Sequence, residues 1–307
     1  MMNVGLLCCG PLVDWLRFAL PHPYRWACLV SAGCGALTIV LCAKIDLSAH
    51  TAQQNTVSGV PETLTRRPSM KGHFDLIDDA ETMYMKQRRR RGFLVLVVLL
   101  VGVRALFRHL DATFPKYFIR RHGPLAPFGM VYSLEPLLII LLVPLVSSDS
   151  SGAASGRGCC GTLRRALRWI QKLPSLSAIT LGCYIGTTAP FVLVLSDAEW
   201  ASPLFVSIIA LGETLWAPRF YTYTHEIAPQ SEVGLYFSMA QVPLFLPKLI
   251  AGVMSGRLLA DYCAAESDCA ESARLWWWVG VSSLPFPFAI HWAVKRGLIL
   301  EARAQAG

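Results

Sequence analysis

The chain has 307 residues, of which 54% are hydrophobic and 16% are charged, and its formal net charge is +8. A soluble globular domain usually carries about 25% charged residues. This deficit, together with long apolar runs, argues against a soluble domain and indicates an integral, multi-pass membrane protein. The basic residues cluster between the apolar runs, so we expect them to orient the chain in the bilayer and not to bind nucleic acid.

Eight apolar segments approach the roughly 20 residues that a helix needs to cross the hydrocarbon core. In chain order they are 2–20, 26–43, 93–114, 124–146, 174–196, 201–222, 233–258 and 275–294. The first is the weakest, because it contains Pro11 and Asp14, and its insertion is left open. The last begins near Trp276, Trp277 and Trp278, which we interpret as an interfacial anchor. The sequence therefore predicts an all-α, polytopic helix bundle with about eight transmembrane helices.

The polar segments divide the chain. We expect two transmembrane helices in 1–43, a basic cytoplasmic linker in 44–92, a six-helix bundle in 93–297 and a cytoplasmic tail in 298–307. The linker is polar and mostly disordered by composition. Its end, FDLIDDAETMYMKQRRRR, is a candidate helix lying along the membrane surface. Lys and Arg are concentrated in the linker, in 147–173 and at the C-terminus, where they are Lys295, Arg296 and Arg303, which predicts that all three regions are cytoplasmic.

This orientation places the acidic loop 261–273 outside. Cys263 and Cys269 lie in that loop and form a candidate disulfide, provided that the loop faces an oxidising compartment. One basic segment, which includes Lys116 and Arg120, also falls outside and departs from the general charge pattern.

Four charged side chains inside the apolar segments are the candidate substrate-binding or proton-coupling residues. They are Asp111, Glu135, Glu213 and Lys248. A charge at the centre of a membrane helix costs about 2.5–3.5 kcal/mol on insertion scales, so four of mixed sign predict a shared polar interior or a water-filled path. Two alternatives stay open: the charges pair statically and fasten helices together, or Lys248 reaches an interface with its long stem.

Prolines and glycines recur in the same segments. The prolines include Pro136, Pro144, Pro190, Pro203, Pro218, Pro243, Pro247, Pro285 and Pro287. Helices kinked around buried charge suit an alternating-access transporter, although proline is also frequent in membrane helices generally. The spacings Gly182…Gly186 and Gly252…Gly256 predict close helix contacts.

Catalytic signatures are lacking in the sequence. It contains no GxSxG, no HExxH and no phosphate-binding glycine loop. We therefore expect a protein that is not an enzyme, with no catalytic residue, no metal ligand and no cofactor.

The stretch GETLWAPRFYTYTHEIAPQSEVGLY, residues 212–236, carries a family resemblance. The order of a basic loop, six helices and a basic tail resembles the carboxyl half of a major facilitator superfamily transporter. The stretch itself is similar to the tenth helix, cytoplasmic turn and eleventh-helix start of proton-dependent oligopeptide transporters. The matching residues are Gly212-Glu213, Pro218, Ala228-Pro229 and Gly234. The resemblance implies that Glu213 helps to bind the amino terminus of a substrate and that Asp111 lies where a proton-coupling acid is expected.

The amino-terminal stretch MNVGLLCCGPLVDWLRFALPHPYRWACLVSAG resembles the fifth and sixth helices of the same fold. On that assignment the chain covers helices five to twelve and lacks the first four. Those helices supply the family's paired acidic and arginine motif and a lysine. We therefore expect a truncated gene model, a fragment, or a chain that needs the missing helices or a partner chain.

The leading hypothesis is a secondary active transporter of a small organic solute, peptide-like or similar, coupled to protons. Its partners are then the lipid bilayer, the solute and protons. The alternative is a non-transporting membrane scaffold or degenerate transporter fragment whose buried charges pair structurally. The sequence does not identify the solute, the driving ion or the host membrane, which is the plasma membrane or that of an organelle.

Overall fold

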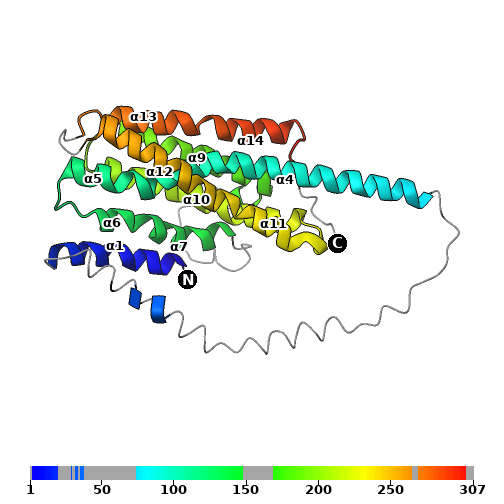
Figure 1. Ribbon diagram of the computed structural model, residues 1–307, viewed down its shortest axis with the longest axis horizontal. Coiled ribbons are helices and arrows are strands. Elements are labelled where there is room, and N and C mark those ends of the chain that lie inside the picture. The colour runs from blue at the N-terminus through cyan, green and yellow to red at the C-terminus, as the bar shows by residue number, and fades with distance from the viewer. Residues whose placement is uncertain are drawn as a thin grey trace. The chain divides into compact units, whose positions relative to one another are not determined.

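The computed structural model describes residues 2–19, 29, 32–33, 35–37, 74–147, 169–264 and 269–301. By contacts the chain divides into two compact units, one of Met1–Asp14 with Lys86–Gly307 and one of Trp15–Met85. The helices described within the smaller unit are the end of α1 and the beginning of α4. The regular elements of the described residues are all helices (Figure 1). They are α1 (Met2–Ala19), α4 (Phe74–Ala112), α5 (Phe114–His122), α6 (Phe128–Tyr132), α7 (Leu134–Ser147), α9 (Ser175–Leu195), α10 (Ala201–Ile227), the 3-10 helix η2 (Gln230–Glu232), α11 (Val233–Ala240), α12 (Val242–Tyr262), α13 (Ser272–Ser283) and α14 (Pro285–Lys295).

Five helical segments of the described chain are long and apolar enough to cross a membrane. They are Met83–Ala112, Phe128–Val146, Ser175–Leu195, Ala201–Ile227 and Val233–Tyr262. Each overlaps one of the eight predicted segments. Of the remaining three, 2–20 and 275–294 form α1 and the pair α13–α14, and most of 26–43 lies outside the described residues. The described part of the chain is therefore an all-α helix bundle, consistent with a multi-pass membrane protein.

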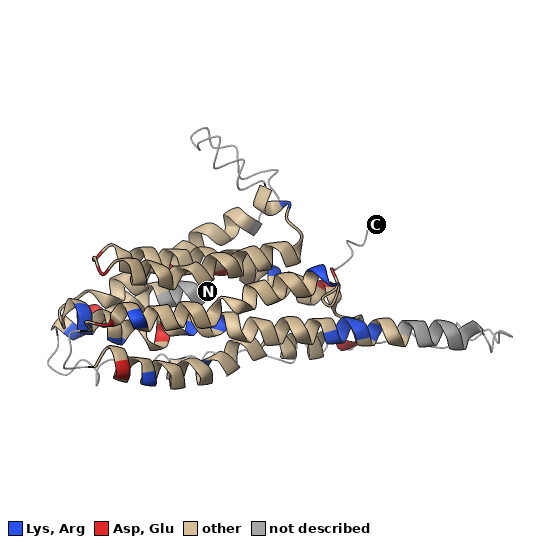
Figure 2. Cartoon of the chain, turned by 90° about the horizontal axis from the view of Figure 1, so that it is seen from above, with Lys and Arg blue, Asp and Glu red and all other residues tan. Residues whose placement is uncertain are grey.

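Helix α4 begins well before the predicted membrane segment. Residues 44–73 of the predicted linker lie outside the described residues, whereas 74–92 are helical and continue into the membrane segment without a break. This part of the sequence has no proline and many good helix formers, so nothing in it stops the helix. Its basic side chains from Lys86 to Arg91 are exposed and form the group of Lys and Arg on α4 in Figure 2.

Helix breaks in the bundle precede prolines. Proline has no N–H to donate and its ring crowds the preceding turn, so a helix often stops just before it. Four breaks follow this pattern: Thr113 before Pro115, Ser133 before Pro136, Gln241 before Pro243, and Leu284 before Pro285. The predicted segments 124–146, 233–258 and 275–294 are consequently each built from two helices.

Helices α9 and α10 approach each other through glycines. A Cβ atom on Gly212 of α10 would lie 2.9 Å from backbone atoms of both Gly182 and Gly186 on α9. The predicted close contact at Gly182…Gly186 is thereby confirmed, because only residues without side chains fit there. At Gly252 and Gly256 an added Cβ would meet nothing within 4 Å, so this second pattern makes no close contact with the described residues.

The interpretation of three tryptophans as one interfacial anchor is wrong for the first of them. Trp276 is fully buried and packs against Tyr117 and Phe205, with ring centroids 5.4 and 5.0 Å away. Trp277 and Trp278 are 50% and 52% exposed. Successive helical residues point about 100° apart, so three in a row cannot share one environment.

The glycine contact predicts the effect of adding a single methyl group. We expect Gly212→Ala to destabilise the protein by about 1–3 kcal/mol, because the methyl group forces the α9 and α10 backbones apart. The measurement is thermal or denaturant-induced unfolding of the purified protein in detergent.

The matched control is Gly252→Ala, a change at a helical glycine with open space around it. It is expected to be neutral or slightly stabilising, because alanine favours helix more than glycine does. Equal stability of the two variants would contradict the role given to Gly212.

Candidate functional site

An ion pair joins α4 to α10 within the membrane-spanning segments. Arg104 Nη1 lies 2.6 Å from Glu213 Oε1, and the two side chains are only 10% and 16% exposed. The guanidinium group also lies over the rings of Phe107 and Trp216, at 5.5 and 5.3 Å from their centroids. Arg104 is thus held by one carboxylate and two aromatic faces, and it neutralises the charge of Glu213 where water is scarce.

A second set of polar contacts links α4 to α6. Arg108 Nη1 lies 2.6 Å from Asp111 Oδ2, and the hydroxyl group of Tyr132 donates a hydrogen bond of 2.7 Å to Asp111 Oδ1. Asp111 and Tyr132 both lie next to proline-associated helix breaks, at Thr113 and Ser133. The breaks therefore bring the end of α4 and the end of α6 into one hydrogen-bonded arrangement.

Glu135, in the first turn of α7, faces Glu213. The two carboxyl groups lie within hydrogen-bonding range of each other, and Asp111 and Arg104 are close enough to interact electrostatically with Glu135. Two carboxyl groups in contact cannot both stay ionised at low cost, and a hydrogen bond between them requires a proton. Glu135 therefore adds a third carboxyl group beside the Arg104–Glu213 ion pair.

We call Arg104, Arg108, Asp111, Tyr132, Glu135 and Glu213 the charged cluster. It draws on α4, α6, α7 and α10 and contains two guanidinium groups and three carboxyl groups. The cluster thus holds one more carboxyl group than guanidinium groups. Asp111 is 40% exposed, whereas the Arg104 and Glu213 side chains are 10% and 16% exposed.

Three of the four predicted charged residues come together in this cluster: Asp111, Glu135 and Glu213. Lys248 does not; its side chain is exposed on α12, with Nζ 5.5 Å from the centroid of the Phe245 ring. Arg104 and Arg108 are members of the cluster that were not among the predicted site residues. Their spacing was the available signal, because Arg104, Arg108 and Asp111 fall four and three residues apart and so share one face of a helix.

Outside the charged cluster, Cys263 and Cys269, the candidate disulfide, are joined by a disulfide bond in the structure.

Among the described residues, no group of three or more His, Cys, Asp or Glu is arranged to hold a metal ion. Searches of protein-family models and of curated proteins find no match to this chain.

The buried ion pair predicts strong energetic coupling between its partners. In a double-mutant cycle of Arg104→Gln and Glu213→Gln, we expect a coupling energy of about 1–3 kcal/mol, because each single change leaves the other charge buried without its partner. Unfolding in detergent measures the four free energies.

The control cycle uses Arg274 and Glu271, an ion pair of the same chemistry at 3.0 Å with side chains 70% and 52% exposed. Solvent screens such a pair, so its coupling is expected to stay below about 1 kcal/mol. A coupling at Arg104–Glu213 no larger than this control would contradict the structural weight given to the pair.

Infrared spectroscopy tests whether the facing carboxyl groups of Glu135 and Glu213 share a proton. At neutral pH the protein should show the carbonyl stretch of a protonated carboxylic acid, and Glu135→Gln should remove it because the remaining carboxylate pairs with Arg104. Glu226→Gln, at an exposed position of α10, is the matched control and should leave the band unchanged. A spectrum without the band, or one that Glu135→Gln leaves intact, would rule out the shared proton.

Proposed function

We propose that this protein is a secondary active transporter that couples proton movement to the transport of a small organic solute. The observation that carries the proposal is the charged cluster, in which the Glu135–Glu213 pair lies beside Arg104 within the membrane-spanning segments. Ionisable residues at membrane depth commonly mark solute and proton pathways. A carboxyl pair whose charge changes with one proton supplies the coupling element.

The proton controls which contacts hold α7 to α10. In the protonated state, the hydrogen bond between Glu135 and Glu213 joins the two helices while Glu213 keeps Arg104. Loss of the proton places two carboxylates face to face, and their repulsion favours separation of the helices. Protonation therefore shifts the population between two arrangements of the bundle, as coupling requires.

Helix breaks near the cluster give the bundle places to bend. The breaks at Thr113 and Ser133 lie within two residues of Asp111, Tyr132 and Glu135. The backbone stays helical at both positions, because Tyr117 N–H and Leu137 N–H still donate to the carbonyl oxygens of Thr113 and Ser133. A change of charge in the cluster thus acts on helices that each lack one backbone donor at a nearby proline.

The chemistry of the cluster favours a solute with both acidic and basic groups. The Nε atoms of Arg104 and Arg108 are buried and make no hydrogen bond to any described residue, so an anionic group can use them only after the cluster rearranges and exposes them. Glu213 and Glu135 can accept from an amino group. With the resemblance to oligopeptide transporters, this supports a peptide-like solute.

A static scaffold is the second candidate. The distances of 2.6 Å for Arg104–Glu213 and 2.6 Å for Arg108–Asp111 favour it, because they show charges that are already paired within the chain. On this alternative the charged cluster fastens helices together, and neutralising it changes stability without affecting any flux.

A transport assay separates the two candidates. The full chain is reconstituted in liposomes with an inward proton gradient and a mixture of di- and tripeptides, and the lumenal contents are measured by mass spectrometry. We expect gradient-driven accumulation of a subset of peptides. Glu213→Gln and Glu135→Gln should each abolish it, because neither variant can bind and release the coupling proton.

Glu226→Gln is again the control, since it makes the same change on the same helix at an exposed site. It should transport like the wild type. Undiminished gradient-driven uptake in Glu213→Gln would contradict the proposal, and a wild-type chain that accumulates no peptide under the gradient would favour the scaffold.

A further inference from the structure

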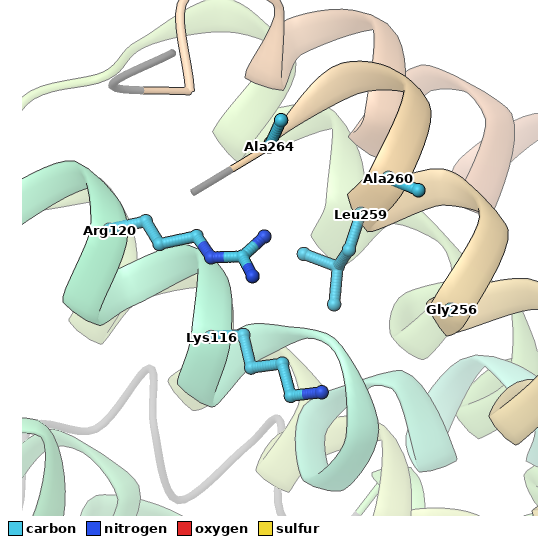
Figure 3. Close-up of a pocket in the computed structure, with 6 residues that line it drawn as sticks. All are labelled: Lys116, Arg120, Gly256, Leu259, Ala260 and Ala264. Carbon is cyan, nitrogen blue, oxygen red and sulfur yellow. The ribbon is translucent and has the colours of Figure 1, made fainter. Parts of the chain in front are cut away.

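A cavity of about 340 Å³ lies between α5 and α12, and none of its lining residues belongs to the charged cluster. The residues that line it are Lys116, Arg120, Gly256, Leu259, Ala260 and Ala264. Figure 3 shows the two basic side chains extending from α5 toward Leu259 and the small residues of α12. The cavity thus has one cationic wall and one apolar wall.

The two basic side chains of the cationic wall can bind an anion. Lys116 and Arg120 are four residues apart, so they occupy the same face of α5. Arg120 Nη1 donates a hydrogen bond to the carbonyl oxygen of Cys263, which fixes the guanidinium group at the cavity. No carboxylate among the described residues forms an ion pair with either cation. Glu266 and Asp268, which lie between the two cysteines of the disulfide, are outside the described residues.

The opposite wall fits an apolar group. Gly256 and Ala260 are exposed, and an added Cβ on Gly256 would meet nothing within 4 Å. The exposed face of α12 continues with large apolar side chains, among them Leu249 and Val253 at 70% and 63% exposure. A ligand held by Lys116 and Arg120 is therefore beside a surface that prefers hydrocarbon to water.

We propose that this cavity binds the anionic headgroup of a membrane phospholipid. The phosphate is held by Lys116 and Arg120, while the apolar part of the lipid lies against Leu259, Gly256 and the exposed face of α12. Charge complementarity selects an anionic lipid over a zwitterionic one, because hydrogen bonds from cationic donors to a phosphate are the strong ones. The proposal does not depend on the transport function.

The charge of the site is tested by native mass spectrometry of the full chain in detergent, titrated with phosphatidylglycerol, phosphatidylcholine or inorganic phosphate. We expect selective phosphatidylglycerol adducts. Lys116→Gln should weaken them about fivefold, since one basic residue near a lipid surface contributes about 1 kcal/mol. Lys116→Arg should restore binding. Lys295→Gln, which removes an exposed charge on α14, is the control and should bind like the wild type.

The shape of the site is tested without changing any charge. Gly256→Leu should fill the cavity and abolish the adducts while leaving the fold intact, since the position is open. Gly252→Leu is the matched control, one turn away, equally open and not part of the cavity lining, and it should still bind. Circular dichroism confirms that each variant is folded.

Three results would overturn the proposal. They are equal binding of phosphatidylcholine and phosphatidylglycerol, an equal loss of binding in Gly252→Leu and Gly256→Leu, and full displacement of the lipid by inorganic phosphate at a similar concentration. The last result would assign the site to a small free anion.

Discussion

The neutralisation of Glu213 by Arg104 is the constraint around which the bundle is arranged. An ionised carboxylate at membrane depth is costly unless a partner offsets its charge, and Arg104 lies 2.6 Å away. The packing of α10 on α9 supports this geometry. Gly212 faces the glycines of α9, and because the next residue points about 100° around the helix, Glu213 is directed elsewhere, toward Arg104 of α4. The close glycine contact and the ion pair are thus two consequences of the same turn of α10.

Prolines determine where the helices that carry the other cluster residues begin and end. Pro115 and Pro136 are associated with the breaks after α4 and α6, so Asp111, Tyr132 and Glu135 all lie near helix ends. Side chains near helix ends can reach neighbours on other helices without straining a regular helix. The same breaks leave backbone groups without a partner in their own helix, so neighbouring helices, side chains or water must form hydrogen bonds with them. Membrane proteins tolerate such groups where the segment is buried in protein or lines a polar path. Two of the four breaks, at Thr113 and Ser133, thus lie beside charged residues of the cluster.

The segments long and apolar enough to cross a membrane, and the acids within them, could be predicted because hydropathy and charge are local properties of the sequence. The pairing of Arg104 with Glu213 could not, since it joins residues more than a hundred positions apart. The burial of Trp276 could not be predicted either, because it depends on how α13 is rotated against Phe205. Its two neighbours, Trp277 and Trp278, are half exposed. Lys248 shows that a charged residue within an apolar segment need not belong to a polar interior, because its long, flexible side chain lies at an exposed position.

The number of carboxyl groups in the cluster bears on the choice between a scaffold and a transporter. A static clamp between helices needs one carboxylate for each guanidinium group, and Glu213 and Asp111 already provide these for Arg104 and Arg108. Glu135 is then superfluous to charge pairing, and ionising it beside Glu213 would destabilise the clamp. A third carboxyl group that keeps its proton adds a hydrogen bond between α7 and α10, whereas one that loses its proton repels Glu213 and weakens that contact. Glu135 is therefore the residue at which the two candidates differ: a scaffold needs a proton that stays, and a transporter needs one that is taken up and released.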